Sequence, residues 1–117
     1  MFILTLTGAI HDYEHGGFNN AYLSKTKDIL AIRYNDQSVL ENHHVAAAFH
    51  IMQSSSHMNV FKSLDQASYK ASRQEMIKMV LGTDMASHFK TIGVIKNRLS
   101  SGELDLMISW FWSYWCG

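Results

Sequence analysis

Apolar positions recur at helical spacing in several stretches of the chain, and short polar segments separate these stretches. The run after Ser38 keeps this spacing to about Gln53, where three serines at 54–56 end it. Ser38 and Glu41 also have the spacing of a capping box, in which each side chain bonds the backbone N–H of the other residue. The pattern predicts a long helix that begins at Ser38.

Two further helices are predicted later in the chain. Asp65 is placed to cap the first, which continues to Leu81 and is weakened by Gly82. Its core-facing positions are Met76, Ile77, Val80 and Leu81. The second helix extends from about Ala86 to Leu99. Its predicted inward positions are Phe89, Ile92 and Ile95, and its outward positions are Lys90, Lys96 and Arg98.

The first ten residues, MFILTLTGAI, are apolar, but their periodicity does not separate strand from helix. β-branched residues at positions 3, 5, 7 and 10 favour a strand. No basic residue precedes the run, and it is too short to cross a bilayer. We therefore expect a buried element and neither a secretory signal nor a membrane segment.

Composition indicates one globular domain at most, because 47% of the 117 residues are hydrophobic and 17% are charged. Ten basic and ten acidic residues cancel, which argues against nucleic acid or an anionic membrane as the main partner. A lone cysteine, Cys116, cannot form an internal disulfide. That composition favours a reducing compartment, and we expect a cytoplasmic location.

The segment from His11 to Tyr22 reads HDYEHGGFNNAY and concentrates groups that bind metals or transfer protons. If it is helical, His11 and His15 share one helix face, as the two zinc ligands of zinc peptidases do. The peptidase motif, however, needs glutamate directly after the first histidine, and this chain has Asp12 there. The spacing of the two histidines alone is a weak signal.

Two later runs sharpen the interpretation: YNDQSVLENHH at residues 34–44 and LGTDMASH at residues 81–88. Together with HDYEHGGFNNAY, they resemble the middle portion of the catalytic domain of class I 3′,5′-cyclic nucleotide phosphodiesterases. The resemblance implies an all-α fold, a helical bundle fragment of this HD-type domain, in which the first ten residues are helical. It covers roughly Leu6 to Phe89, with Gly16 where many relatives carry proline.

By the same resemblance, His11 and Asp12 are metal ligands, and Asp12 reaches both zinc and a second ion, magnesium or manganese. A carboxylate can bridge two cations, while neutral imidazole suits zinc better than magnesium. Paired cations lower the pKa of a shared water, so that hydroxide attacks the phosphorus of cAMP or cGMP. The substrate would be a cyclic nucleotide, and the product a 5′ monophosphate.

Four residues are expected by resemblance to support the catalytic centre through hydrogen bonds to water on the magnesium: His15, Glu41, His44 and Thr83. Glu41 is also a candidate for the capping-box partner of Ser38, and it can fill both roles at once. A Glu41–His44 hydrogen bond is permitted by their spacing, and His43 faces elsewhere.

The remaining polar candidates have less specific interpretations. Asn20 and Asn35 are expected to be turn and loop residues, and Asp84 is either a helix cap or a charge beside a histidine. Three other histidines are expected to be structural: His50, His57 and His88.

The expected domain comprises residues 1–107, followed by an atypical aromatic tail at 108–117 that contains all three tryptophans. Only two protein ligands for zinc are present, whereas zinc normally takes three or four. Three hypotheses therefore stand: part of a cyclic nucleotide phosphodiesterase, a catalytically inactive fragment that associates with other phosphodiesterase chains, or a hydrolase for other phosphoesters. The YNDQSVLENHH run argues against the third.

Overall fold

The first ten residues form a helix rather than a strand. In the computed structural model, which describes residues 2–101 and gives only the backbone at 87–91, α1 spans Phe2–Ile10. The Thr7 hydroxyl donates to the Ile3 carbonyl one turn back, so this β-branched polar residue is accommodated within the helix. All the elements of the described residues are helices, so the predicted all-α fold is confirmed.

Six helices follow one another in the part of the chain that the structure describes, and the chain divides into two units, residues 1–84 and 85–117. The first unit holds α1, α2 (Asn20–Lys25), α3 (Ile29–Arg33), α4 (Val39–Gln53) and α5 (Gln66–Leu81). The second contains α6 (Met85–Ser100). The long helices lie within one or two residues of their predicted bounds, whereas the sequence pattern did not locate α2 or α3.

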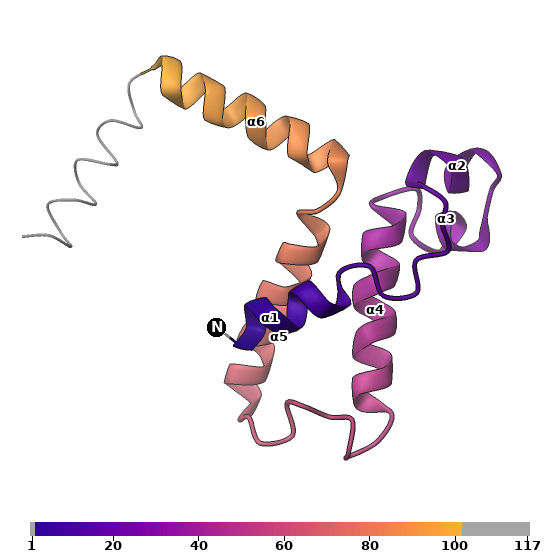
Figure 1. Ribbon diagram of the computed structural model, residues 1–117, viewed down its shortest axis with the longest axis vertical. Helices are drawn as coiled ribbons and strands as arrows, with labels where there is room; N and C mark the ends of the chain where they lie inside the picture. Colours follow the sequence, from indigo (N-terminus) through magenta and orange to yellow (C-terminus); the bar gives the residue numbers. More distant parts are fainter. Residues whose placement is uncertain (1, 102–117) are drawn as a thin grey trace, which may run out of the picture. The chain divides into compact units, whose positions relative to one another are not determined.

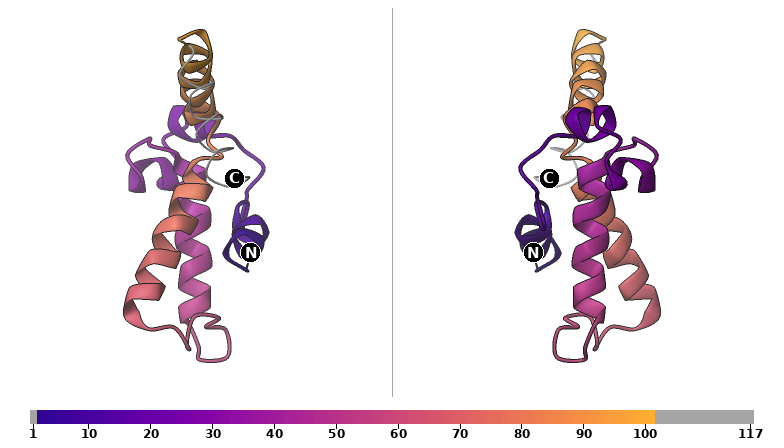
Figure 2. Two further views of the ribbon diagram at one scale, coloured as in Figure 1. Left: turned by 90° about the vertical axis from the view of Figure 1, so that its left-hand side faces the viewer. Right: turned by 90° about the vertical axis from the view of Figure 1, so that its right-hand side faces the viewer.

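The core of the first unit is the contact between α4 and α5, which run side by side and are joined by the loop at 54–65 (Figures 1 and 2). α1 packs against both helices. The buried side chains of this core are Val45, Ala48, Phe49, Met52, Phe61, Met76 and Val80. A smaller cluster joins α2 and α3 to the start of α4, through Leu23, Ala31, Val39 and Leu40. This packing holds α2 and α3 against the first turn of α4.

The two long helices begin in different ways. α5 has the predicted cap, since the Asp65 carboxylate accepts from the Ser68 backbone N–H at 2.9 Å. The capping box predicted at α4 is wrong: Ser38 lies in the left-handed region with φ of 40° and makes no side-chain cap bond. Its hydroxyl donates instead to Asp84 at 2.7 Å, and Glu41 accepts from Asn20.

The second unit confirms part of the pattern predicted for the last helix. Ile92 is half-buried, and Lys96 and Arg98 are exposed, but Ile95 is 47% exposed rather than inward. α6 is the described helix of its unit, so no described neighbour within that unit covers Ile95. The side chains of Phe89, Lys90 and His88, and the tail at 108–117, lie outside the described residues.

Candidate metal centre

The loop after α1 carries the histidine and aspartate residues singled out in the sequence. It leaves the helix through a turn in which Tyr13 N–H donates to Ile10 and His15 N–H donates to Asp12. Glu14 then adopts a left-handed φ of 61°, which a continuing helix does not allow. The segment from His11 to His15 is therefore a turn and not a helix, so these two histidines do not share a helix face.

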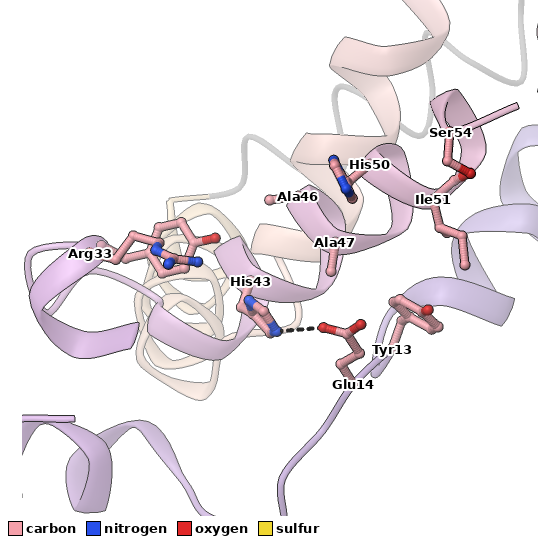
Figure 3. Close-up of a pocket in the computed structure, with 10 residues that line it drawn as sticks. Tyr13, Glu14, Arg33, His43, Ala46, Ala47, His50, Ile51 and Ser54 are labelled. Atoms are coloured by element: carbon pink, nitrogen blue, oxygen red, sulfur yellow. Dashed lines mark hydrogen bonds and ion pairs between the residues drawn. The ribbon is translucent and has the colours of Figure 1, made fainter. Parts of the chain in front are cut away.

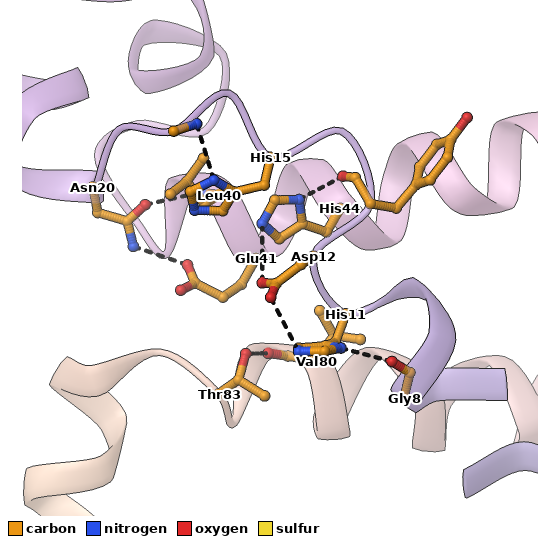
Figure 4. Close-up of polar contacts among 12 residues, drawn as sticks. Gly8, His11, Asp12, His15, Asn20, Leu40, Glu41, His44, Val80 and Thr83 are labelled. Carbon is orange, nitrogen blue, oxygen red and sulfur yellow. Dashed lines mark hydrogen bonds and ion pairs between the residues drawn. The ribbon is translucent and has the colours of Figure 1, made fainter. Parts of the chain in front are cut away.

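Two imidazoles flank the carboxylate of Asp12 (Figure 4). His11 Nε2 lies 3.1 Å from one oxygen, and His44 Nε2, from α4, lies 4.0 Å from the other. Each ring is oriented through its second nitrogen, since His11 Nδ1 is 2.7 Å from the Gly8 carbonyl and His44 Nδ1 is 2.6 Å from that of Tyr13. A carbonyl only accepts, so both Nδ1 atoms carry the proton and both Nε2 atoms face Asp12.

Burial determines the charge of His44, whose side chain is 2% exposed. Removal from water lowers the pKa of His44, although the Tyr13 carbonyl and the Asp12 carboxylate act in the opposite direction. The imidazole is therefore neutral at pH 7, and its Nε2 presents a lone pair toward Asp12. Two acceptors that face one another favour a cation or a hydrogen-bond donor beside them.

The donor set fits a divalent metal in type but not in number. Asp12 is 65% exposed and His11 45%, so an ion can reach both side chains. Imidazole nitrogen with carboxylate oxygen suits zinc, and the carboxylate suits magnesium or manganese. Across the described part of the chain, however, no three His, Cys, Asp or Glu side chains are arranged to hold one ion. Within that part of the chain, His11 and Asp12 offer two candidate donors, fewer than the three or four protein ligands that zinc normally takes.

The expected supporting residues surround this pair from three elements. The His15 ring stacks on His44 with centroids 5.6 Å apart, and its Nδ1 accepts from the Gly17 N–H. Glu41 accepts from Asn20, and His44 bonds Tyr13, so these two side chains use other partners in place of the Glu41–His44 hydrogen bond that their spacing permits.

Thr83 follows α5, and its hydroxyl donates to the Val80 carbonyl at 2.7 Å. It lies with His11 on the wall of a cavity of about 450 Å³ between α1 and the end of α5.

The His43 side chain lines a cavity, whereas the His44 side chain faces Asp12. The Nε2 atom of His43 pairs with Glu14 at 2.9 Å across this cavity of about 690 Å³, floored by Ala46 and Ala47 (Figure 3). His50 lines the same cavity. The sequence prediction that His43 faces away from the centre is confirmed.

Sequence reasoning missed two polar contacts near the centre. Asn20 was expected to be a turn residue, yet its side chain bonds both Glu41 and the Leu40 N–H. Asp84, 9% exposed, accepts the Ser38 hydroxyl across 46 positions of sequence. One signal was present for Asn20: a helix needs one N-cap, and two asparagines are adjacent at 19 and 20.

Comparison with known proteins identifies the family. The sequence profile described as 3′5′-cyclic nucleotide phosphodiesterase matches residues 1–113. The chain belongs to the 3′,5′-cyclic nucleotide phosphodiesterase family. It is 41% identical over 103 residues to the dual specificity calcium/calmodulin-dependent 3′,5′-cyclic nucleotide phosphodiesterase 1C of Mus musculus, a match that covers 88% of this chain and 15% of that protein. It is 42% identical over 103 residues to the 1B protein of Homo sapiens, covering 88% and 19%.

The structural match leads to the same family. The phosphodiesterase domain of the Salpingoeca rosetta rhodopsin phosphodiesterase superposes with a TM-score of 0.79 and 36% sequence identity. That match covers 86% of this chain and 30% of the solved domain. The chain therefore spans less than a fifth of the length of these two curated relatives and 30% of the solved domain, so it corresponds to part of the catalytic domain.

Among the described residues, no helix has the length and apolar character to span a membrane.

Proposed function

We propose that this chain supplies part of the metal centre of an enzyme that hydrolyses 3′,5′-cyclic nucleotides to 5′ monophosphates. The observation that carries the proposal is the Asp12 carboxylate held between two imidazoles whose Nδ1 atoms are fixed by backbone carbonyls. Membership in the phosphodiesterase family, whose members are generally metal-dependent, supports it.

In this proposal His11 and Asp12 bind the ions, zinc at the imidazole and magnesium or manganese at the carboxylate. When bound, the ions supply an activated water and neutralise charge on the phosphate. The remaining residues orient this centre: His44 holds its Nε2 toward Asp12, His15 stacks on His44, and Glu41 stands beside His44. Further ligands would come from parts of the domain that this chain does not span.

A chimaera tests the proposal without requiring activity of the isolated chain. Residues 2–84 replace the matching segment of the solved Salpingoeca rosetta domain, and hydrolysis of cAMP and cGMP is measured. We expect an active chimaera in which Asp12→Ala lowers kcat/KM by more than about 100-fold, since loss even of groups that orient a ligand costs 10- to 100-fold. Asp28→Ala, which removes the α3 cap, is the matched control. Equal activity of the Asp12 variant and the unaltered chimaera would contradict the proposal.

A second candidate is an inactive fragment that associates with other phosphodiesterase chains. Exposed apolar side chains on the short helices favour it, with Ile29 at 65% and Ile32 at 63% exposure. Sedimentation of the isolated chain tests this alternative: a concentration-dependent rise in mass that Ile29→Ser with Ile32→Ser abolishes supports it, and a monomer at all concentrations contradicts it.

A further inference from the structure

Two adjacent asparagines at the start of α2 have different contacts. Asn19 is the N-cap of this helix, and its Oδ1 accepts from the Tyr22 N–H at 2.8 Å. Asn20 is therefore not needed to begin α2, and its side chain extends to α4 instead (Figure 4).

The Asn20 amide makes two hydrogen bonds that fix its orientation. Its Oδ1 accepts from the Leu40 N–H at 2.9 Å, and its Nδ2 donates to Glu41 Oε2 at 2.9 Å. A flipped amide would lose both bonds, because a backbone N–H only donates and a carboxylate only accepts. The Leu40 N–H is one of the first four of α4, which have no partner within the helix, and Ser38 makes no side-chain cap bond.

The Glu41 carboxylate that Asn20 holds belongs to the electrostatic surroundings of His44. Both Asp12 and Glu41 favour the protonated form of the His44 imidazole and so act against the lowering of its pKa by burial, and Figure 4 shows the two carboxylates with this ring. Glu41 is half-buried, and a glutamate has several rotamers that would direct its carboxylate to solvent. The hydrogen bond from Asn20 selects among them.

We infer that Asn20 is a positioning residue that fixes the Glu41 carboxylate beside His44 and Asp12. The inference rests on the proposed function for its consequence: a carboxylate held in this place can bond water on an ion bound at Asp12. Loss of such an orienting group typically weakens metal affinity 10- to 100-fold.

The first experiment uses the 117-residue chain without metal, so it does not depend on the proposed function. Asn20→Asp keeps the acceptor for Leu40 but replaces the donor to Glu41 with a second carboxylate, and we expect the Tm to fall. Adding Glu41→Gln supplies an amide that can donate to the introduced carboxylate, and the Tm should recover most of the loss. A double variant that is no more stable than Asn20→Asp would overturn the inference.

The second experiment compares Asn20→Ala with Asn19→Ala, which truncate neighbouring asparagines without changing charge. Both substitutions are made in the chimaera described above, which supplies the remaining parts of the domain. Mn²⁺ is titrated into each variant, and the broadening of backbone amide NMR signals is followed at residues 11–15. We expect about 10-fold weaker Mn²⁺ binding for Asn20→Ala and unchanged binding for Asn19→Ala. Equal binding by the Asn20 variant, or an equal loss in both, would overturn the metal-positioning role.

The two experiments separate the two possible failures. If Mn²⁺ does not broaden residues 11–15 of the unaltered chimaera, the proposed metal centre fails and the metal-positioning role fails with it. The Tm comparison then still decides whether Asn20 holds Glu41.

Discussion

The N-termini of α4 and α5 form side-chain hydrogen bonds with different kinds of partner. Both helices have unpaired N–H groups in their first turn, and both follow a residue that sequence rules favour as a cap. Asp65 bonds Ser68, three residues away. At α4, the Leu40 N–H donates to Asn20, 20 positions away, and the Ser38 side chain donates to Asp84, 46 positions away, instead of capping the helix. The N-capping rule, which uses only residues next to the helix start, therefore holds at α5. It fails at α4, where the helix start lies beside a site built from several segments.

The largest expected effect is at the long-range contact of α4. Asp84→Ala removes the acceptor of the Ser38 hydroxyl in a buried place, and hydrogen bonds to charged groups are worth about 1.5–3 kcal/mol. We expect the free energy of unfolding to fall by about 2 kcal/mol in urea titrations. Asp84→Asn retains an acceptor and should recover part of the loss. If the alanine variant is as stable as the unaltered chain, α4 does not depend on this contact.

The contribution of His44, on α4, to the stability of the fold should depend on pH near neutrality. Burial holds the pKa of His44 below its ordinary value, so the unfolded chain binds more protons than the folded chain as the pH falls below about 6.5. Stability is then fully present above that pH and decreases below it. Thermal melts from pH 8 to 5 with a chelator should show this decline, and His44→Gln should flatten it. A decline unchanged by this variant would assign the effect to another group.

The stability that the Asp65 cap of α5 contributes should change only at acidic pH. Hydrogen bonds from the Ser68 backbone N–H and hydroxyl hold the pKa of Asp65 below its ordinary value. This contribution to stability is present above about pH 3.9 and is lost as the pH falls through the lower, folded pKa. Asp65→Ala should lower the Tm by a few degrees at pH 7 and by less at pH 2. Asp65→Asn serves as the control, because it keeps a capping oxygen without the charge.

The smallest effect is expected on the exposed surface of α5. Lys78 and Glu75 form an ion pair at 2.8 Å, with side chains 71% and 60% exposed. Lys78→Ala should change the free energy of unfolding by less than about 0.5 kcal/mol, because exposed pairs are screened by water and salt. A change comparable to that of Asp84→Ala would remove the contrast between surface contacts and the contacts at the centre.

Much of the fold could be predicted from local pattern, because α4, α5 and α6 have helical spacing and recognisable ends. α2 and α3, of six and five residues, are too short for periodicity and depend on packing against α4. Among the site residues, the Asp12 cluster followed from the resemblance, but its geometry did not. The roles of Asn20 and Asp84 depend on which distant segments come together in the fold. The spacing of residues along the chain does not give this information.

The most direct measurement is anomalous diffraction at the zinc edge from crystals of the chimaera grown with zinc. The expected result is a peak about 2.0–2.2 Å from both His11 Nε2 and an Asp12 oxygen, with Glu41 still accepting from Asn20. A zinc peak elsewhere in the domain, with none at Asp12, would contradict the assignment of this carboxylate as a metal ligand.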